Sequence, residues 1–326
     1  MSQTIALTGA TGFIGGALAQ RLAASGHSVH ALVRPASVHK RPDELDIRWI
    51  EGDLADLESL RRLVRGADAV VHCAGTVRGA TRSQFDRINV DGVKRLVQAV
   101  GEQQPAPRFL LLSSVAARQP HLSHYAASKR QGEIVLAEGA VNTAWTIFRP
   151  CAVYGPGERE LLPLFRWMAR GIAFLPGAGQ ARFSMLHIDD LAEAVVRWLE
   201  SENTPGRTYE LHDGHPDGYS QQDIADTVAK LRAAPVIRVK VPAFFLKALA
   251  AFNLVFALAA RYAPMLTPGK VRELSHVNWV CDNGPLNADT GWVPHISLAQ
   301  GLEHTLWGKT APGKAVHAAQ EKRKKV

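Results

Sequence analysis

Short apolar runs alternate with segments of helical periodicity over the first half of the chain. Runs of β-branched and other apolar residues, which we predict to be strands, occupy residues 4–8, 28–34, 48–51, 69–73, 108–112 and 144–149. Segments with helical periodicity, which we predict to be helices, occupy residues 12–25, 57–65, 85–102 and 124–138. Repeated strand–helix–strand units form parallel sheets with right-handed crossovers. The pattern predicts an α/β fold, a doubly wound parallel sheet with helices on both faces.

The pattern becomes less regular after Pro150. We expect a strand at 183–186 and a helix at 190–200 to return to the sheet domain, and a further strand at 208–211. The rest should form a smaller, mostly helical cap over the carboxyl ends of the strands, where ligands bind in such sheets. The expected boundaries are residues 1–150 with 183–204 for the sheet domain, 151–182 with 205–308 for a substrate-binding cap, and 309–326 for a basic, disordered tail.

Charge is concentrated at one end of the 326-residue chain. The net charge is +8, and the last 18 residues hold five Lys and one Arg against one Glu, so the tail carries +5 and the body +3. A body with so little charge gives no case for nucleic-acid binding. We interpret the tail as solvated and disordered, with electrostatic attraction to an anionic membrane as the alternative.

The cysteines indicate the cellular compartment. Cys73, Cys151 and Cys281 are too few and too scattered for a disulfide framework or a zinc site. They are typical of a reducing compartment, and the first apolar run is already a strand, so no signal peptide is expected. We therefore expect a cytoplasmic protein that binds no metal.

The longest apolar region spans residues 241–263. Lys247, Asn253 and Arg261 interrupt it, whereas a membrane span needs about 20 nearly uninterrupted apolar residues. We interpret the region as a buried or interfacial helix. An ordinary packed cap helix, a wall for a lipophilic substrate and peripheral membrane contact all stay open.

A glycine-rich turn joins the first strand to the first helix. Gly9 permits the tight turn, Gly12 lets the backbone approach a pyrophosphate, and Gly15 allows close packing of the helix. The phosphates would face the N-terminus of the helix and its free N–H groups. The turn predicts a dinucleotide site in a Rossmann domain, with contacts from Gly9, Thr11, Gly12, Phe13, Ile14 and Gly15.

Arg34 ends the second strand, at a position where an NAD-preferring site usually carries Asp or Glu. A carboxylate there would repel a 2′-phosphate, whereas a guanidinium can bind it. His39, Lys40 and Arg41 follow. The sequence therefore predicts NADPH in preference to NADH, with stacking of Arg34 on adenine as the alternative.

Two further strand ends are expected to touch the cofactor. Asp53 follows the third strand, where it can reach the adenine, and its alternative role is to cap the helix that begins near Leu57. Cys73, Ala74 and Gly75 end the fourth strand, and small residues there let the backbone lie against the cofactor.

Tyr125 and Lys129 lie four residues apart and so share one face of a predicted helix. A free tyrosine has a pKa of about 10, and a nearby ammonium lowers that pKa by favouring the phenolate. Lysine can also hold a nicotinamide ribose. Ser114 can orient a substrate oxygen, and strand alternation turns only one of Ser113 and Ser114 into the site. The pair predicts proton transfer at an oxygen while hydride moves at the adjacent carbon.

In their order along the chain, these motifs resemble the landmarks of extended short-chain dehydrogenases/reductases over about residues 3 to 300. The matching segments are Gly9/Gly12/Gly15, Asp53-Leu54, Ser113-Ser114, Tyr125-x-x-x-Lys129, Arg149-Pro150-x-x-Val153-Tyr154-Gly155-Pro156-Gly157 and His187-x-Asp189-Asp190-Leu191. The resemblance implies Tyr125 as acid/base, Lys129 as its partner and Ser114 as the ligand of the substrate oxygen. It also implies a homodimer through the helices at 85–102 and 124–138, and cofactor contacts from Leu54, Tyr125, Lys129, Pro150 and Val153.

Two departures limit the resemblance to nucleotide-sugar members of this superfamily. Many of them carry Asn at the position of Ala152, and the motif around it is more similar to the hydroxysteroid and ketone-reductase branch. Only ten residues separate Ser114 from Tyr125, fewer than in many sugar epimerases, so that wall of the pocket should differ. Arg182 keeps a diphosphosugar substrate open, because arginine suits phosphate.

Some polar and aromatic residues near the motifs are expected to be structural. We interpret His187, Asp189 and Asp190 in this way, with either aspartate capping the following helix. Asn89 is expected to pack, and Trp279 to lie in the core.

Together these features predict an NAD(P)-dependent oxidoreductase that interconverts a secondary alcohol and a ketone on a small, lipophilic molecule. The first alternative is a nucleotide-sugar epimerase or dehydratase with tightly held NAD. The second is a non-catalytic NAD(P)-binding subunit or sensor.

Overall fold

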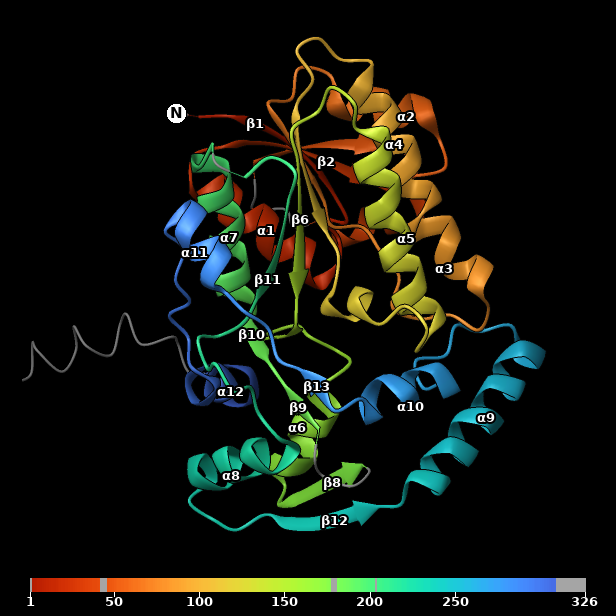
Figure 1. Ribbon diagram of the computed structural model, residues 1–326, viewed down its shortest axis with the longest axis vertical. Coiled ribbons are helices and arrows are strands. Elements are labelled where there is room, and N and C mark those ends of the chain that lie inside the picture. Colours follow the sequence, from red (N-terminus) through yellow and green to blue (C-terminus); the bar gives the residue numbers. More distant parts are fainter. Residues whose placement is uncertain (1, 42–45, 177–180, 203, 309–326) are drawn as a thin grey trace, which may run out of the picture.

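A seven-stranded parallel sheet forms the centre of the molecule (Figure 1). The structure, a computed structural model, describes residues 2–41, 46–176, 181–202 and 204–308. The strands lie in the order β11-β6-β5-β4-β1-β2-β3, so the connectivity reverses between β1 and β4, and the predicted doubly wound fold is confirmed. Their bounds are β1 (Thr4–Thr8), β2 (Ser28–Val33), β3 (Ile47–Glu51), β4 (Ala69–His72), β5 (Arg108–Leu112), β6 (Trp145–Pro150) and β11 (Arg207–Leu211).

Helices cover both faces of this sheet. Ile5 and Leu7 point into the core on one face, and Ala6 between them points into the core on the other. Both faces are buried, which explains the nearly continuous apolar runs in the strands. The covering helices are α1 (Phe13–Ala24) and α7 (Ile188–Glu200) on the first face, and α2 (Leu57–Val64), α4 (Asp91–Gly101) and α5 (His124–Gly139) on the second.

The single helix predicted at 85–102 is two helices, α3 (Arg82–Asn89) and α4. The break falls at Val90, where φ is −116°. Just before it, the Asn89 side chain accepts a hydrogen bond from the Thr76 N–H (2.9 Å) and donates to the Ser128 hydroxyl (2.9 Å). These tertiary hydrogen bonds stabilise the break, and helical periodicity alone does not reveal them.

The strand predicted at 183–186 does not join the central sheet. Its residues fall in two short strands that pair elsewhere, β9 (Arg182–Phe183) with β13 (Asn278–Trp279) and β10 (Met185–His187) with β7 (Ala152–Tyr154). The strand predicted at 208–211 is β11, at the edge of the central sheet, although it falls within the range 205–308 that we assigned to the cap. An apolar run identifies a strand, but tertiary contacts select its partner.

One of the remaining helices, α11 (Gly284–Thr290), packs beside α7 and β11, whereas most of the remaining chain forms helices and a strand pair beside the carboxyl ends of the sheet (Figure 1). Tyr154, Phe165, Ile224 and Leu302 belong to a separate apolar cluster there. Residues 309–326, the predicted basic tail, lie outside the described residues. The other elements are α6 (Leu162–Ala169), β8 (Ile172–Pro176) paired with β12 (Ile237–Val241), α8 (Gln221–Arg232), α9 (Ala243–Ala260), α10 (Pro268–Ser275) and α12 (Leu298–Trp307).

Helix α9 differs from the buried helix expected within 241–263. It lies along the outer edge of the molecule, and its buried residues are Ala250 and Ala257 (Figure 1). Of our two interpretations, a buried or an interfacial helix, the buried one is therefore wrong, and the interfacial one stays a prediction. Apolar periodicity could not separate a core helix from an exposed apolar one, because both carry apolar residues all round.

Candidate active site

A cavity of about 2080 Å³ lies at the carboxyl ends of the central strands and extends to α9 and α10. Every residue that we predicted for catalysis or cofactor binding lines it. These residues follow six different strands of the sheet, from β1 through β6. The fold therefore gathers into one space the side chains that the sequence distributes between positions 9 and 153.

The glycine turn forms a close-packed cradle at one end of the cavity. Gly9 has a φ of +80°, and a Cβ there would lie 2.7 Å from the main-chain nitrogen of Ala74. A Cβ on Gly15 would clash with the carbonyl oxygen of Gly9. Gly12 precedes α1, whose first turn carries no acidic residue. A free helix N-terminus beside a turn without side chains suits a pyrophosphate, so these residues fit a dinucleotide.

Basic residues lie beyond this cradle, at the end of β2. Arg34 is exposed and lines the cavity together with His39 and Lys40, which belong to the short 3₁₀ segment Pro35–Lys40. Arg41, also basic and next in sequence, does not line it. Arg34 and Lys40 therefore place positive charge at this end of the cavity.

Asp53 borders the same end of the cavity. Its carboxylate accepts a hydrogen bond from the Ala55 N–H (2.8 Å). The cap of α2 is Asp56, which accepts from the N–H groups of Glu58 and Ser59. The alternative role that we gave Asp53, as the helix cap, is therefore wrong.

A buried hydrogen bond between β1 and β4 supports the loop that carries Cys73, Ala74 and Gly75. The Thr8 hydroxyl bonds to His72 Nδ1 (2.8 Å) and accepts from the Ala74 N–H (3.2 Å). Burial, with a smaller effect of the Lys129 charge, lowers the pKa of His72 to about 3, so the ring is neutral. Burial has the opposite effect on Cys73 and raises its pKa to about 12. The thiol is therefore protonated at neutral pH and is no nucleophile. The sequence reasoning gave Thr8 and His72 no role, because their hydrogen bond joins residues 64 positions apart.

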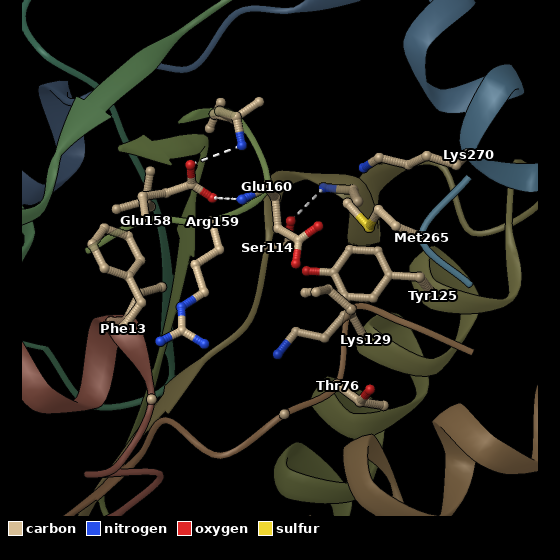
Figure 2. A pocket seen from close by; sticks show the side chains of 18 of the residues that line it. Phe13, Thr76, Ser114, Tyr125, Lys129, Glu158, Arg159, Glu160, Met265 and Lys270 are labelled. Atoms are coloured by element: carbon tan, nitrogen blue, oxygen red, sulfur yellow. Dashed lines mark hydrogen bonds between the residues drawn. The ribbon is translucent and has the colours of Figure 1, made fainter. Parts of the chain in front are cut away.

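The two serines after β5 have different partners. Ser113 donates to Glu133 (2.6 Å), and Glu133 is in turn held by Arg149 (2.6 Å). The Ser114 hydroxyl accepts from the Ala116 N–H (3.2 Å) and lies beside the ring of Tyr125 (Figure 2). Both serines line the cavity, but Glu133 occupies the hydroxyl of Ser113, whereas the hydroxyl of Ser114 lies beside Tyr125.

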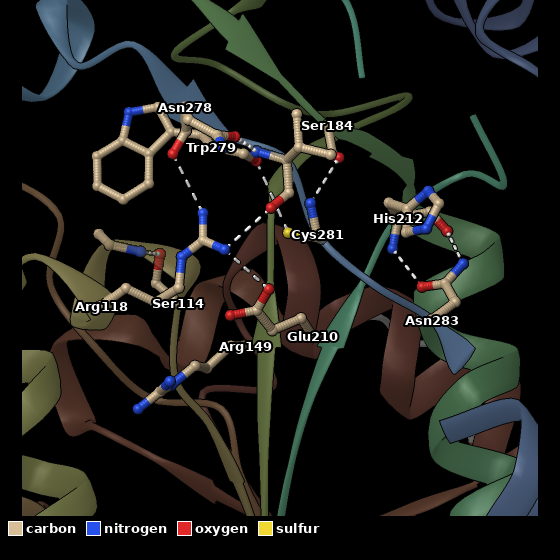
Figure 3. Close-up of polar contacts among 12 residues, drawn as sticks. Ser114, Arg118, Arg149, Ser184, Glu210, His212, Asn278, Trp279, Cys281 and Asn283 are labelled. Carbon is tan, nitrogen blue, oxygen red and sulfur yellow. Dashed lines mark hydrogen bonds and ion pairs between the residues drawn. The ribbon is translucent and has the colours of Figure 1, made fainter. Parts of the chain in front are cut away.

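The segment after Ser114 is anchored by Arg118, at the end of the 3₁₀ turn Val115–Arg118. The guanidinium forms an ion pair with Glu210 of β11 (3.1 Å) and donates to the carbonyl oxygens of Val280 (2.9 Å) and Asn278 (3.3 Å), as Figure 3 shows. These contacts tie the Ser114 loop to the sheet edge and to the strand β13. Sequence reasoning did not single out Arg118, whose partners lie about 90 and 160 residues away.

Tyr125 lies in the first turn of α5, which begins after the cap residue Ser123. Its ring packs near Phe85 at a centroid distance of 6.2 Å, and its hydroxyl points into the cavity (Figure 2). Burial raises the pKa of Tyr125 to about 12, a hydrogen bond with Ser114 opposes the rise, and the charge of Glu273 adds to it. The expected lowering of this pKa by Lys129 is wrong here, because desolvation dominates.

Lys129 lies one turn further along α5 and points into the same cavity (Figure 2). Its ammonium donates to the carbonyl oxygen of Leu112 at 2.6 Å. Burial lowers the pKa of Lys129 to about 8, and the charge of Glu133 acts in the opposite direction. The lysine is therefore placed to donate hydrogen bonds to a ligand below this pH.

The end of the cavity away from the glycine turn carries many apolar side chains, together with charged ones such as Lys270, Arg272 and Glu273. Met265 lies beside the ring of Tyr125 in Figure 2, with Lys270 nearby. Trp279, which we expected in the core, also lines the cavity. The sequence could not show these residues, because they belong to segments more than 130 positions after Tyr125 and have no motif. The apolar residues of this wall include Leu164, Phe174, Val241, Leu246, Leu254, Met265, Leu266 and Leu274.

Arg182, which kept a diphosphosugar substrate open, is absent from the cavity wall. Its guanidinium donates to the carbonyl oxygens of Asp217 (2.7 Å) and Gly218 (2.9 Å). Arg159 instead extends into the cavity between Glu158 and Lys129 (Figure 2). Arg182 thus joins β9 to the segment at Asp217 and Gly218.

We expected Asp189 or Asp190 to cap the helix that follows, but the cap of α7 is His187. His187 is buried and caps α7, which begins at Ile188, by accepting from the Asp189 N–H (3.3 Å). Asp190 accepts from the N–H groups of His295 and Ile296, both at 3.0 Å. Ligand atoms of His187, Asp189 and His304 lie within 4.8 Å of one another, and His187 Nε2 has no hydrogen-bond partner among the described residues.

The fold and the cavity together define an NAD(P)-dependent enzyme of the extended short-chain dehydrogenase/reductase type. The chain belongs to the NAD dependent epimerase/dehydratase family, whose model matches residues 5–211.

Known proteins similar to the chain include two bacterial reductases. The ceramide reductase of Caulobacter vibrioides is 34% identical over 309 residues, which cover 94% of this chain and 95% of that protein. The 2-alkyl-3-oxoalkanoate reductase of Stenotrophomonas maltophilia is 28% identical, with 91% of this chain and 97% of that protein covered. A solved structure of UDP-glucuronic acid 4-epimerase from Bacillus cereus in complex with NAD has a TM-score of 0.72 at 20% identity, covering 93% of this chain and 97% of the other. The last comparison concerns the fold alone.

Proposed function

We propose that this protein uses NADPH to reduce a ketone in a long-chain, lipophilic molecule to a secondary alcohol. The observation that carries the proposal is the position of Tyr125, between the dinucleotide end of the cavity and its apolar end. A ketone beside the tyrosine hydroxyl would leave alkyl chains among Leu246, Leu254 and Met265. The names of the two reductases that resemble this chain, which refer to a ceramide and to an alkyl-substituted 3-oxoalkanoate, support the same class.

The side chains of the site supply the proton chemistry of such a reduction. When bound, the nicotinamide supplies the hydride that adds to the carbonyl carbon. Tyr125 donates its phenolic proton to the carbonyl oxygen, and Ser114 donates a hydrogen bond to the same oxygen as its charge develops. Lys129 stabilises the resulting phenolate and binds the ribose hydroxyls of the cofactor.

The direction of the reaction is supported by the state of the acid. Burial raises the pKa of Tyr125 to about 12, so the phenol is protonated at neutral pH and ready to donate. Alcohol oxidation would need the phenolate, which is scarce at that pH. NADPH is proposed over NADH because Arg34, His39 and Lys40 line the dinucleotide end.

Steady-state kinetics with a series of ketones test the proposal. We expect NADPH-dependent turnover of 3-oxo esters, with kcat/KM rising as the alkyl chain lengthens, and no turnover of UDP-sugars. Turnover of a UDP-sugar without net consumption of NADPH would support the epimerase alternative instead. The cytoplasmic location and the homodimer through α3, α4 and α5 stay predictions.

A further inference from the structure

One side of α9 is apolar and exposed. Phe244 is 73% exposed, Phe252 71% and Val255 67%, and Phe245 and Phe256 are more than half exposed. A helix that is apolar all round is normally buried in a core or in a membrane. The 18 residues of α9 have a mean hydropathy of 2.0, yet only 11% of them are buried. The helix is therefore not a core helix.

The opposite side of α9 attaches the helix to the protein. Ala250 and Ala257 are buried, and Asn253 between them donates to the carbonyl oxygen of Leu266 (2.7 Å). Tyr262 forms a further hydrogen bond with the Asn253 side chain. Because these contacts hold the helix along its length, crossing a bilayer would break them. The geometry instead suits a helix that lies in the plane of a membrane surface.

The charge around α9 has one sign. No Asp or Glu occurs from residue 227 to residue 272, whereas the same stretch contains eight basic residues. Lys240, Lys247 and Arg261 are exposed. Such a surface is complementary to anionic lipid headgroups. A second copy of the chain would bring an equally basic surface, and like charges disfavour that contact.

The same helix borders the cavity. Leu246 and Leu254, on the side of α9 that faces the protein, line its apolar end, and the exposed Phe245 directly precedes Leu246. The exposed phenylalanine side of α9 and part of the apolar cavity wall therefore belong to the same helix.

We propose that α9 docks on an anionic lipid bilayer, with the phenylalanine side immersed, and that the enzyme takes its ketone substrate directly from this bilayer. The second part rests on the proposed function. Docking itself depends only on the surface of α9. Such helices bind because their apolar side chains become buried at the boundary between headgroups and acyl chains. Basic residues at the edges of the helix add an electrostatic attraction to anionic lipids.

Vesicle flotation of the full chain tests the docking. The vesicles contain phosphatidylcholine with or without one third phosphatidylglycerol. We expect the wild type to float with the anionic vesicles, and the variant Phe245→Ser/Phe252→Ser/Phe256→Ser to bind about a hundredfold more weakly. The matched control Val141→Ser/Val293→Ser removes exposed valines elsewhere on the surface and should float as the wild type does. Wild-type protein that stays with the buffer would overturn the proposal.

A second variant tests how much the basic residues contribute to vesicle binding. Lys240→Gln/Lys247→Gln should weaken binding to anionic vesicles by about fivefold for each lysine, and should not change binding to neutral vesicles. Equal loss on both kinds of vesicle would contradict anionic recognition. A dimer in light scattering that the triple serine variant dissociates, with no vesicle binding, would identify a second copy as the occupant and overturn the proposal.

Two substrates separate this inference from the proposed function. A short, water-soluble 3-oxo ester reports on chemistry alone, and a long-chain 3-oxo ester embedded in anionic vesicles reports on chemistry and delivery. The triple serine variant should reduce the soluble ester normally and lose at least about tenfold in rate on the embedded ester. Equal rates for variant and wild type on the embedded ester would overturn delivery from the bilayer. Failure of the wild type on both esters, with vesicle binding intact, would overturn the proposed function and leave docking standing.

Discussion

The ammonium of Lys129 lies 2.6 Å from the carbonyl oxygen of Leu112, the last residue of β5. This hydrogen bond joins α5 to the strand end that precedes Ser113 and Ser114. Because the side chain is held there, the charge stays beside the cavity in the absence of any ligand. Desolvation lowers its pKa to about 8, so the charge is present at neutral pH and lost in mildly alkaline solution.

A plot of kcat/KM for NADPH against pH should therefore show an alkaline limb, a decrease caused by deprotonation of Lys129. Below pH 8 the ammonium is protonated and can bind the cofactor ribose, and above that pH the charge is lost, so kcat/KM for NADPH should fall as pH rises. Tyr125, with a pKa of about 12, adds no limb in this range. Lys129→Arg keeps its charge and should lack the alkaline limb. An unaltered limb in that variant would assign the titration to another group.

Removing the tyrosine hydroxyl should affect chemistry and spare binding. Tyr125→Phe should lower kcat by about two to four orders of magnitude, because the proton donor to the substrate oxygen is lost. NADPH binding, measured by fluorescence titration, should stay within about twofold of wild type, since Phe keeps the ring packing against Phe85. Near-native turnover in this variant would contradict the acid role.

The two adjacent serines should give opposite phenotypes. Ser114→Ala should lower kcat by about tenfold to a hundredfold with little change in melting temperature, because its hydroxyl is proposed to act on the substrate oxygen. Ser113→Ala removes a hydrogen bond to the buried Glu133 and should cost about 1–3 kcal/mol of stability. Thermal unfolding and kinetics on both variants check this division, and a kinetic defect confined to Ser113→Ala would reverse it.

The packing of the glycine turn predicts a stability difference between two glycines. Gly15→Ala places a Cβ against the carbonyl oxygen of Gly9 and should cost about 1–3 kcal/mol and weaken NADPH binding. Gly101→Ala, at the end of α4, meets no atom within 4 Å and should be neutral or stabilising by up to about 1 kcal/mol. Chemical denaturation of the two variants is the measurement, and equal stabilities would contradict the close packing.

Cofactor preference should depend on the charge at the end of β2. Arg34→Asp should raise KM for NADPH and shift the ratio of kcat/KM for NADPH and NADH by about tenfold or more towards NADH, because a carboxylate repels the 2′-phosphate. Arg41→Asp makes the same charge change at a residue outside the cavity and should shift the ratio less. A wild-type preference for NADH would contradict the reasoning from Arg34.

The dinucleotide cradle and the Tyr125/Lys129 pair could be predicted because their geometry is local. Gly9, Gly12 and Gly15 lie within one strand–turn–helix unit, and residues four apart on a helix share a face whatever surrounds them. The supporting contacts could not be predicted in this way. Thr8 and His72 meet across two strands 64 residues apart, and nothing in either local sequence indicates the pairing.

The sequence also did not reveal the environment of a residue that it predicted for the site. Spacing places Tyr125 near Lys129, but it does not reveal that desolvation outweighs the ammonium and raises the tyrosine pKa. Nor did the apolar composition of 241–263 distinguish a core helix from the exposed α9, because burial depends on what packs against a helix and not on its own residues.

The sequence by itself determined the parallel α/β architecture, the glycine turn and the order of the site motifs, since strand and helix periods and tight turns depend on residues close together in the chain. The tertiary structure decided which strands pair, as for β9 and β10, which serine bonds to the buried Glu133 and which apolar helix stays exposed. These outcomes depend on contacts between segments far apart in the chain, whose free energies exist only once the segments have packed together.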